Sequence, residues 1–307
     1  MTSPSRSYSF DVPRPIAAGL RQITSPAPQR APGALNVEQL VQLYRSYAPE
    51  LQRVRGDQQR LYDTRGNLHL ERVASSFRLR SMLEMLGMPA EYHRLLKPQL
   101  DDLEAEATYL LLRQLKPRTV VEIAPDGGWS TSWLLAALRD NGSGQLFSYD
   151  IFDHSTRTVV PDLARGRWTF VQGDVRDRLT LLPPRIDYLF LDCAHSASFA
   201  RWYVRELFPR LAPGTPIAIH DIFPTQSGES RVVRKWLHER GIDYFTTAPA
   251  AAPSVYDRLM QVKRELGVDT PIHDSSRNPM VFFRLPQDVA RAERDTSTAA
   301  ATCPADS

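Results

Sequence analysis

The sequence has little cysteine and no long apolar run. Only two of its 307 residues are cysteine, Cys193 and Cys303, which is too few for a disulfide framework and indicates a reducing compartment. No window approaches the roughly 18 apolar residues of a membrane span. We therefore expect a cytoplasmic protein without a membrane partner. The net charge is only +3, with basic residues spread among acids, which argues against nucleic acid as a partner.

The two ends of the chain also lack features of a folded domain. Residues 1–36 are rich in Pro, Ser and Arg, contain one acidic residue, Asp11, and have no apolar run like that of a signal peptide. We expect this segment to be disordered, because its prolines also disfavour the amphipathic helix of an organellar transit peptide. The tail, residues 287–307, has an Ala/Thr/Asp/Ser composition that is typical of disorder.

Residues 37–115 have a helical pattern. Helices are predicted over 37–47, with Asn36 as N-cap and Pro49 as a stop, over 72–87, and over 101–115 with acids in its first turn. This helical region precedes the first strand, and with the long stretch between residues 248 and 277 we expect it to cover the substrate as a lid.

Residues 116–286 alternate between short β-branched or aromatic runs and helical segments. Strands are predicted over 119–124, 145–151, 168–174, 186–192 and 215–221, and two more near 243–247 and 278–285. This alternation is the pattern of an α/β domain, a mostly parallel sheet with helices on both faces. Ligands of such sheets bind at the carboxyl ends of the strands.

Polar residues gather at those predicted strand ends. The acidic residues there are Glu122, Asp150, Asp174, Asp192 and, after His220, Asp221. The Gly127-Gly128 turn lets backbone approach a ligand closely, and Ser130 and Thr131 offer hydroxyls and free N–H groups at the next helix start. Asp150 is placed to accept both hydroxyls of a ribose, and Asp174 to reach an adenine amino group.

The same features would suit a nicotinamide dinucleotide, but the G-x-G-x-x-G fingerprint is absent, since residues 124–129 read APDGGW. The segment EIAPDGGWST resembles the first motif of class I S-adenosylmethionine-dependent methyltransferases, with Ala124 and Asp126 in place of two of its three glycines. The resemblance implies a Rossmann-like fold with a seven-stranded sheet. It also implies S-adenosylmethionine as cofactor, bound by Glu122, Ala124, Gly128, Ser130, Thr131, Asp150 and Asp174.

A second signature narrows the branch. DCAHS (192–196) and IAIHDIF (217–223) resemble the methyltransferases that include macrolide-sugar O-methyltransferases and cephalosporin hydroxylase-like proteins. That resemblance implies His195 as general base beside Asp192, and a metal held by Asp192, His220 and Asp221. His220 stands where the branch has an acid, and imidazole favours zinc, iron or manganese over Mg²⁺. The alternative is that His220 only hydrogen-bonds across the strand ends.

The sequence thus predicts an S-adenosylmethionine-dependent methyltransferase, an enzyme that methylates oxygen on a small-molecule or natural-product acceptor. The alternative is a protein with the methyltransferase fold but without methyl transfer, acting as a scaffold, a regulatory partner or in other sulfonium chemistry. A dinucleotide oxidoreductase is a third reading. Nitrogen or carbon acceptors, the identity of the metal and a homo-oligomeric state are left open by the sequence.

Overall fold

The computed structural model describes residues 35–65, 98–223, 225–272, 276–287 and 289. All of the described residues belong to one compact unit. The predicted helix over 72–87, nearly all of the N-terminal segment and most of the tail lie outside the described residues. No described helix is both long enough and apolar enough to cross a lipid bilayer.

The core of the unit is a seven-stranded sheet with the order β3-β2-β1-β4-β5-β7-β6. Its strands are β1 (Thr119–Ile123), β2 (Gln145–Asp150), β3 (Trp168–Gln172), β4 (Tyr188–Leu191), β5 (Pro216–Ile219), β6 (Tyr244–Thr246) and β7 (Val281–Arg284). Strands β1 to β5 pair in parallel, and β7 is antiparallel to β5 and β6. The predicted fold class is confirmed. The strand order reverses between β1 and β4, and sheets of this kind bind their ligands at such a point.

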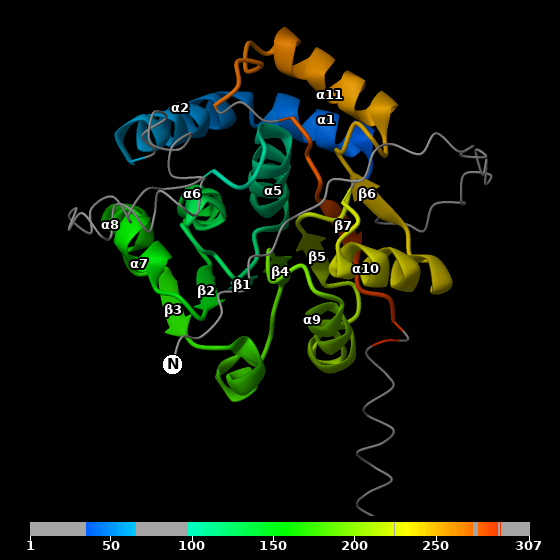
Figure 1. The fold of residues 1–307 in the computed structure, drawn as a ribbon. Helices are drawn as coiled ribbons and strands as arrows, with labels where there is room; N and C mark the ends of the chain where they lie inside the picture. Colours follow the sequence, from blue (N-terminus) through cyan, green and yellow to red (C-terminus); the bar gives the residue numbers. More distant parts are fainter. Residues whose placement is uncertain (1–34, 66–97, 224, 273–275, 288, 290–307) are drawn as a thin grey trace, which may run out of the picture. The chain divides into compact units, whose positions relative to one another are not determined.

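Helices cover both faces of the sheet (Figure 1). Helices α5 (Asp102–Leu115) and α6 (Trp129–Asn141) lie on one face, and α9 (Ala197–Trp202) and α10 (Gly228–Glu239) on the other. A hydrophobic core lies on each face of the sheet, and adjacent β1 residues belong to different cores. Val120 is in the core with α5 and α6, and Val121 is in the core with α9 and α10. This alternation follows from the two-residue period of a strand. Shorter elements complete the order: α7 (His154–Thr158), α8 (Pro161–Ala164), 3₁₀ turns at Val175–Asp177, Leu179–Leu181 and Phe208–Arg210, and a π turn at Tyr203–Leu207.

Three more helices form an outer layer over α5 and α6 (Figure 1). Helix α1 (Val37–Ser46) begins with the predicted cap: Asn36 accepts the Gln39 N–H, and Gln39 accepts the Asn36 N–H. Helix α1 ends before Pro49, as expected, but a second helix that was not predicted, α2 (Ala48–Arg65), starts directly after Tyr47. Proline is tolerated in a first helical turn, whose N–H groups have no partner within the helix.

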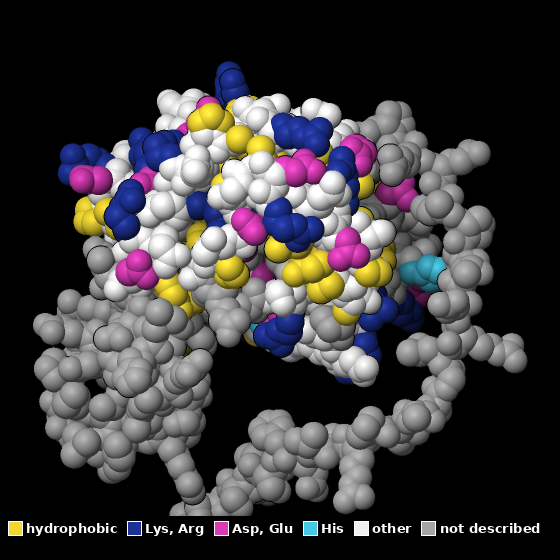
Figure 2. Space-filling view, turned by 90° about the horizontal axis from the view of Figure 1, so that it is seen from above, with side chains coloured by type: hydrophobic (Ala, Val, Ile, Leu, Met, Phe, Trp, Pro, Cys, Tyr) yellow, Lys and Arg dark blue, Asp and Glu magenta, His cyan; other side chains and the backbone are white. Residues whose placement is uncertain are grey.

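Helix α11 (Pro253–Glu265), the helix of the predicted insertion, packs against α1. On the face seen in Figure 2, Lys and Arg side chains lie beside Asp and Glu side chains. Two such pairs join these helices: Arg45 lies 3.3 Å from Glu265, and Arg258 lies 3.6 Å from Glu38. The predicted lid region and the insertion therefore meet in one layer.

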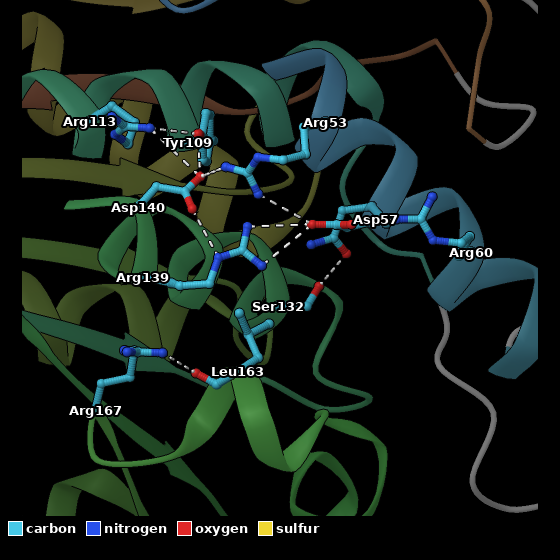
Figure 3. Close-up of polar contacts among 11 residues, drawn as sticks. Arg53, Asp57, Arg60, Tyr109, Arg113, Ser132, Arg139, Asp140, Leu163 and Arg167 are labelled. Carbon is cyan, nitrogen blue, oxygen red and sulfur yellow. Dashed lines mark hydrogen bonds and ion pairs between the residues drawn. The ribbon is translucent and has the colours of Figure 1, made fainter. Parts of the chain in front are cut away.

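Polar contacts fasten α2 to α6 (Figure 3). Arg53 Nη2 donates to Asp140 Oδ2 at 2.7 Å, and Arg139 lies 3.4 Å from Asp57 Oδ2. Ser132 Oγ, buried at the start of α6, donates to Gln58 at 2.8 Å. The helical region 37–65 is thus bonded to the domain that carries the sheet.

A buried ion cluster joins the outer layer to α5. Glu106 is fully buried and binds Arg55 from α2, Lys263 from α11 at 2.7 Å and the Tyr44 hydroxyl from α1 at 2.6 Å. A buried carboxylate is stable only when donors surround it. Burial and the neighbouring Arg55 lower the pKa of Lys263 to about 7, so this amine can lose its charge, whereas an arginine cannot.

We predict that Glu106→Ala lowers the free energy of unfolding by about 3 kcal/mol or more, because it leaves the buried Arg55 cation without this partner. Denaturant unfolding of wild type and variant measures the difference. The control is Glu239→Ala, which breaks an exposed pair with Lys235 and should cost no more than about 1 kcal/mol. Equal losses in the two variants would contradict a structural role for the cluster.

Candidate active site

The loop after β1 is a tight turn with strained backbone. Ala124, Asp126 and Gly128 have φ angles of 63°, 38° and 83°. Non-glycine residues adopt this left-handed region rarely, and such strain is concentrated at functional sites. A Cβ on Gly128 would lie 2.9 Å from Val159 Cγ2, so this position needs glycine. Helix α6 starts at the next residue, and the N–H groups of its first turn have no partner within the helix.

Asp150, the predicted ribose ligand, ends β2 and binds this turn. Its Oδ2 accepts the Asp126 N–H at 2.9 Å, and its Oδ1 accepts the Phe152 N–H at 3.0 Å. Burial raises the pKa of Asp150, and these two N–H groups oppose the rise. Each carboxylate oxygen has two lone pairs, so Asp150 retains acceptor capacity for two ligand hydroxyls.

Asp126, which replaces a glycine of the resembled motif, binds residues of two other segments through its side chain. Its Oδ2 accepts from Gln99 Nε2 at 3.0 Å, and its Oδ1 lies 3.1 Å from His154 Nδ1. The His154 ring in turn stacks on Phe152, with 5.3 Å between centroids. The replacement therefore links the segment before α5 to the start of α7, across the turn.

Asp174, the predicted adenine ligand, follows β3 and is paired with an arginine. Arg176 Nε and Nη2 donate to its two carboxylate oxygens at 3.0 and 2.6 Å. This hydrogen-bonded pair lowers the pKa of Asp174. Asp174 thus lies at the predicted strand end, and its carboxylate is bound to the Arg176 guanidinium.

Glu122, Ser130 and Thr131, all predicted to bind the cofactor, bind one another. Glu122 is fully buried and accepts hydrogen bonds from Ser130 at 2.6 Å, Thr131 at 2.8 Å and Ser148 at 2.6 Å. These side chains fasten α6 to β1 and β2 and so fix the turn between them. Burial raises the pKa of Glu122 to about 7, against the lowering effect of the three hydroxyls.

Three of the predicted catalytic and metal-binding residues, Asp192, His195 and Asp221, lie together at the carboxyl ends of β4 and β5. His195 Nε2 lies 3.3 Å from Asp221 Oδ2 and 4.0 Å from Asp192 Oδ1. One donor atom from each of the three lies within 4.8 Å of the others, so this set could hold a metal ion. His195 and Asp221 have φ angles of 25° and 55°, which adds two strained residues to those of the β1 turn.

His220, the other predicted metal ligand, is buried beside both acids, with its Nδ1 3.8 Å from Asp221 Oδ2. Its Nδ1 is 3.1 Å from Asp192 Oδ1, and its Nε2 is 3.4 Å from Glu104 Oε2, on the first turn of α5. Burial alone would lower the pKa of His220, but these two carboxylates raise it well above its usual range. The donor set above contains His195 in place of His220.

The sequence reasoning missed Glu229, which is 1% exposed and lies in the first turn of α10. Its Oε2 is 2.9 Å from His195 Nδ1. This hydrogen bond raises the pKa of His195 against the effect of burial, and Asp221 adds to the rise. The only sequence signal was an acid at the start of a helix that follows a strand, which is far too common to select this residue.

The comparisons agree with this geometry. A family model described as a methyltransferase domain matches residues 121–222, less than half of the chain. This span runs from β1 through β5 and includes the β1 turn, Asp150, Asp192, His195 and Asp221. This match agrees with the predicted resemblance to methyltransferases over residues 121–222.

Solved structures give weaker likeness. The O-methyltransferase TomG from Streptomyces achromogenes, involved in tomaymycin synthesis and solved with SAM, is 15% identical, with 64% of this chain and 86% of that one covered and a TM-score of 0.45. An O-methyltransferase from Bacillus cereus, solved with SAH, is 13% identical, with 81% and 100% covered and a TM-score of 0.42. Both scores are below 0.5, so the fold assignment rests on the strand order and the family match. No curated protein matches the sequence.

We predict that the stability of the wild type relative to Glu122→Gln falls as pH rises from 4.5 to about 7. The folded carboxyl keeps its proton up to about 7, whereas its ordinary pKa is 4.5, so the advantage present below 4.5 is lost as pH rises through about 7. The expected change is on the order of 3 kcal/mol. Thermal or urea unfolding across this range measures it, with the exposed Asp162→Asn as control. A pH-independent difference would mean that folded Glu122 ionises normally.

Proposed function

We propose that this chain is an S-adenosylmethionine-dependent methyltransferase that acts on a hydroxyl of a small molecule, such as a natural-product intermediate. The observation that carries the proposal is the pair of sites at adjacent strand ends. One is the strained β1 turn bound to Asp150, and the other is His195 between Glu229 and Asp221. The first suits a nucleoside with a ribose, and the second suits proton removal from an acceptor.

The residues of the first site fit the cofactor. The strained turn at Ala124 and Gly128 exposes backbone to a ligand, Asp150 retains acceptor capacity for ribose hydroxyls, and Asp174 supplies a carboxylate one strand further. Glu122, Ser130 and Thr131 support this site by holding the turn. S-adenosylmethionine, when bound, supplies an electrophilic methyl group on a sulfonium.

His195 would act as general base. Its side chain is 40% exposed, so an acceptor hydroxyl can reach Nε2. As that nitrogen takes the proton, the Asp221 carboxylate at 3.3 Å and Asp192 at 4.0 Å stabilise the imidazolium that forms. The remaining requirement is in-line placement of the oxygen, which positioning by the protein provides.

A divalent cation, where one binds, would be held by Asp192 and Asp221. If His195 also coordinates that cation through Nε2, it can no longer act as the base, so the two roles are exclusive. Carboxylate ligands alone suit Mg²⁺, whereas a shell that includes an imidazole suits transition metals. Metal dependence therefore reports which role His195 has.

We predict that the metal-free protein binds S-adenosylmethionine and S-adenosylhomocysteine with micromolar affinity, and that Asp150→Ala weakens both. The expected loss is about 10-fold, which corresponds to the ~1.4 kcal/mol of one lost hydrogen-bonded contact. Isothermal titration calorimetry measures both affinities. Asp162→Ala, which changes a side chain that is 84% exposed, is the matched control. Absence of binding in the wild type would favour a methyltransferase-fold protein without methyl transfer.

We predict that His195→Asn lowers methyl transfer by about 10²–10⁴-fold, the usual contribution of a general base, while S-adenosylmethionine affinity is unchanged. Transfer of a labelled methyl group to a panel of hydroxylated small molecules measures the rate. The assay is run with EDTA, Mg²⁺ and Mn²⁺. Full activity of the variant rules out His195 as the base. Activity of the wild type only with Mn²⁺ indicates that His195 is a metal ligand.

A further inference from the structure

We propose that Glu229 is the positioning residue of His195: it keeps a proton on Nδ1 and thereby leaves Nε2 as the ring atom that accepts the acceptor's proton. The inference rests on the proposed function, because it assigns a partner to the base of that reaction. Nothing in the resembled motifs contains Glu229, which lies in α10 beyond the matched span.

The direction of the hydrogen bonds at Glu229 follows from its partners. Its Oε1 lies 3.0 Å from the Tyr203 hydroxyl and 3.7 Å from Cys193 Sγ, and both groups are buried. A carboxylate oxygen only accepts hydrogen bonds, so the Tyr203 hydroxyl and the Cys193 thiol donate to Oε1. For the same reason, Oε2 of this carboxylate is an acceptor for His195.

Glu229 Oε2 lies 2.9 Å from His195 Nδ1, closer than the 3.3 Å between Asp221 Oδ2 and Nε2, so these contacts favour the proton on Nδ1. The hydrogen bond at one imidazole nitrogen sets the state of the other. The neutral ring therefore has its lone pair on Nε2, which is the nitrogen that lies 3.3 Å from Asp221. Without Glu229, the ring could also place its proton on Nε2 and lose its function as base.

Backbone contacts hold Glu229 and His195 in this register. The Glu229 N–H donates to the His195 carbonyl oxygen at 3.2 Å. Glu229 therefore binds both the backbone and the ring of His195. The start of α10 also touches the start of α9, since a Cβ on Gly228 would lie 2.6 Å from the Ala197 nitrogen. Glycine at this position lets the helix approach closely enough for Glu229 to reach the ring.

The first test is ¹⁵N NMR of histidine-labelled protein, with His195→Asn used to assign the His195 signals. At a pH where the ring has lost one proton, we expect the wild type to have the proton on Nδ1. We expect Glu229→Ala to gain the Nε2–H form and Tyr203→Phe to keep the wild-type form. Tyr203→Phe removes another hydrogen bond to the same carboxylate, so it controls for a purely structural role of Glu229.

A wild-type ring with its proton on Nε2 would overturn the proposal, and so would an unchanged tautomer in folded Glu229→Ala. Should Glu229→Ala fail to fold, the wild-type spectrum still decides. This measurement needs neither acceptor nor methyl transfer, so it is independent of the proposed function. Failure to bind S-adenosylmethionine would refute that function while the tautomer is measured separately.

The second test is kinetic, on an acceptor found with the labelled-methyl panel. We expect Glu229→Ala to lower kcat by about 10–100-fold, the usual effect of losing a group that orients a functional histidine, with KM for S-adenosylmethionine little changed. Glu239→Ala, which changes an exposed acid of the same helix, should leave kcat close to that of the wild type. Equal loss of kcat in both variants would assign Glu229 a structural role and overturn the proposal.

Discussion

Burial of carboxylates is the constraint on which this structure depends. Four glutamates, at positions 104, 106, 122 and 229, are 0–1% exposed. A buried carboxylate must have its oxygens satisfied by hydrogen bonds, because isolated burial of the charge is prohibitively unfavourable. Each glutamate therefore gathers donors from separate elements. Glu122 joins β1, β2 and α6, and Glu106 joins α1, α2, α5 and α11. Glu229 joins α10 to His195 and to Tyr203 in the π turn.

Helix α5 shows how these constraints reach the site. Glu104 and Glu106 are two residues apart, so they point to nearly opposite sides of the helix. Glu106 binds the outer layer through Arg55 and Lys263, while Glu104 accepts the Met280 N–H at 2.6 Å and lies beside His220. The helix is thus fixed from outside and contributes an acid to the strand-end cluster. The helices before β1 therefore help to hold α5, and with it Glu104, in place beside His220.

The sequence predicted what depends on local pattern. Strand alternation, the Asn36 cap and the acids at strand ends are encoded in neighbouring residues, and the structure has them at those positions. Helix α2 was missed because Pro49 signals a stop unless it falls in a first turn, which depends on where the helix begins. Glu104 and Glu229 could not be selected, since their partners are distant in sequence and an acid in a first helical turn usually faces solvent.

His220 shows how a replaced residue changes a site through its neighbours. The resembled branch has an acid here, and sequence reasoning could treat the imidazole only as a softer ligand. The structure gives His220 two carboxylate partners, Asp192 and Glu104, which raise its pKa well above the usual range. His220 Nδ1 lies 3.1 Å from Asp192 Oδ1, so this imidazole is already hydrogen-bonded to one of the acids that would hold a metal ion. His195, hydrogen-bonded to Glu229, is the imidazole that lies with Asp192 and Asp221 in the candidate metal-binding set.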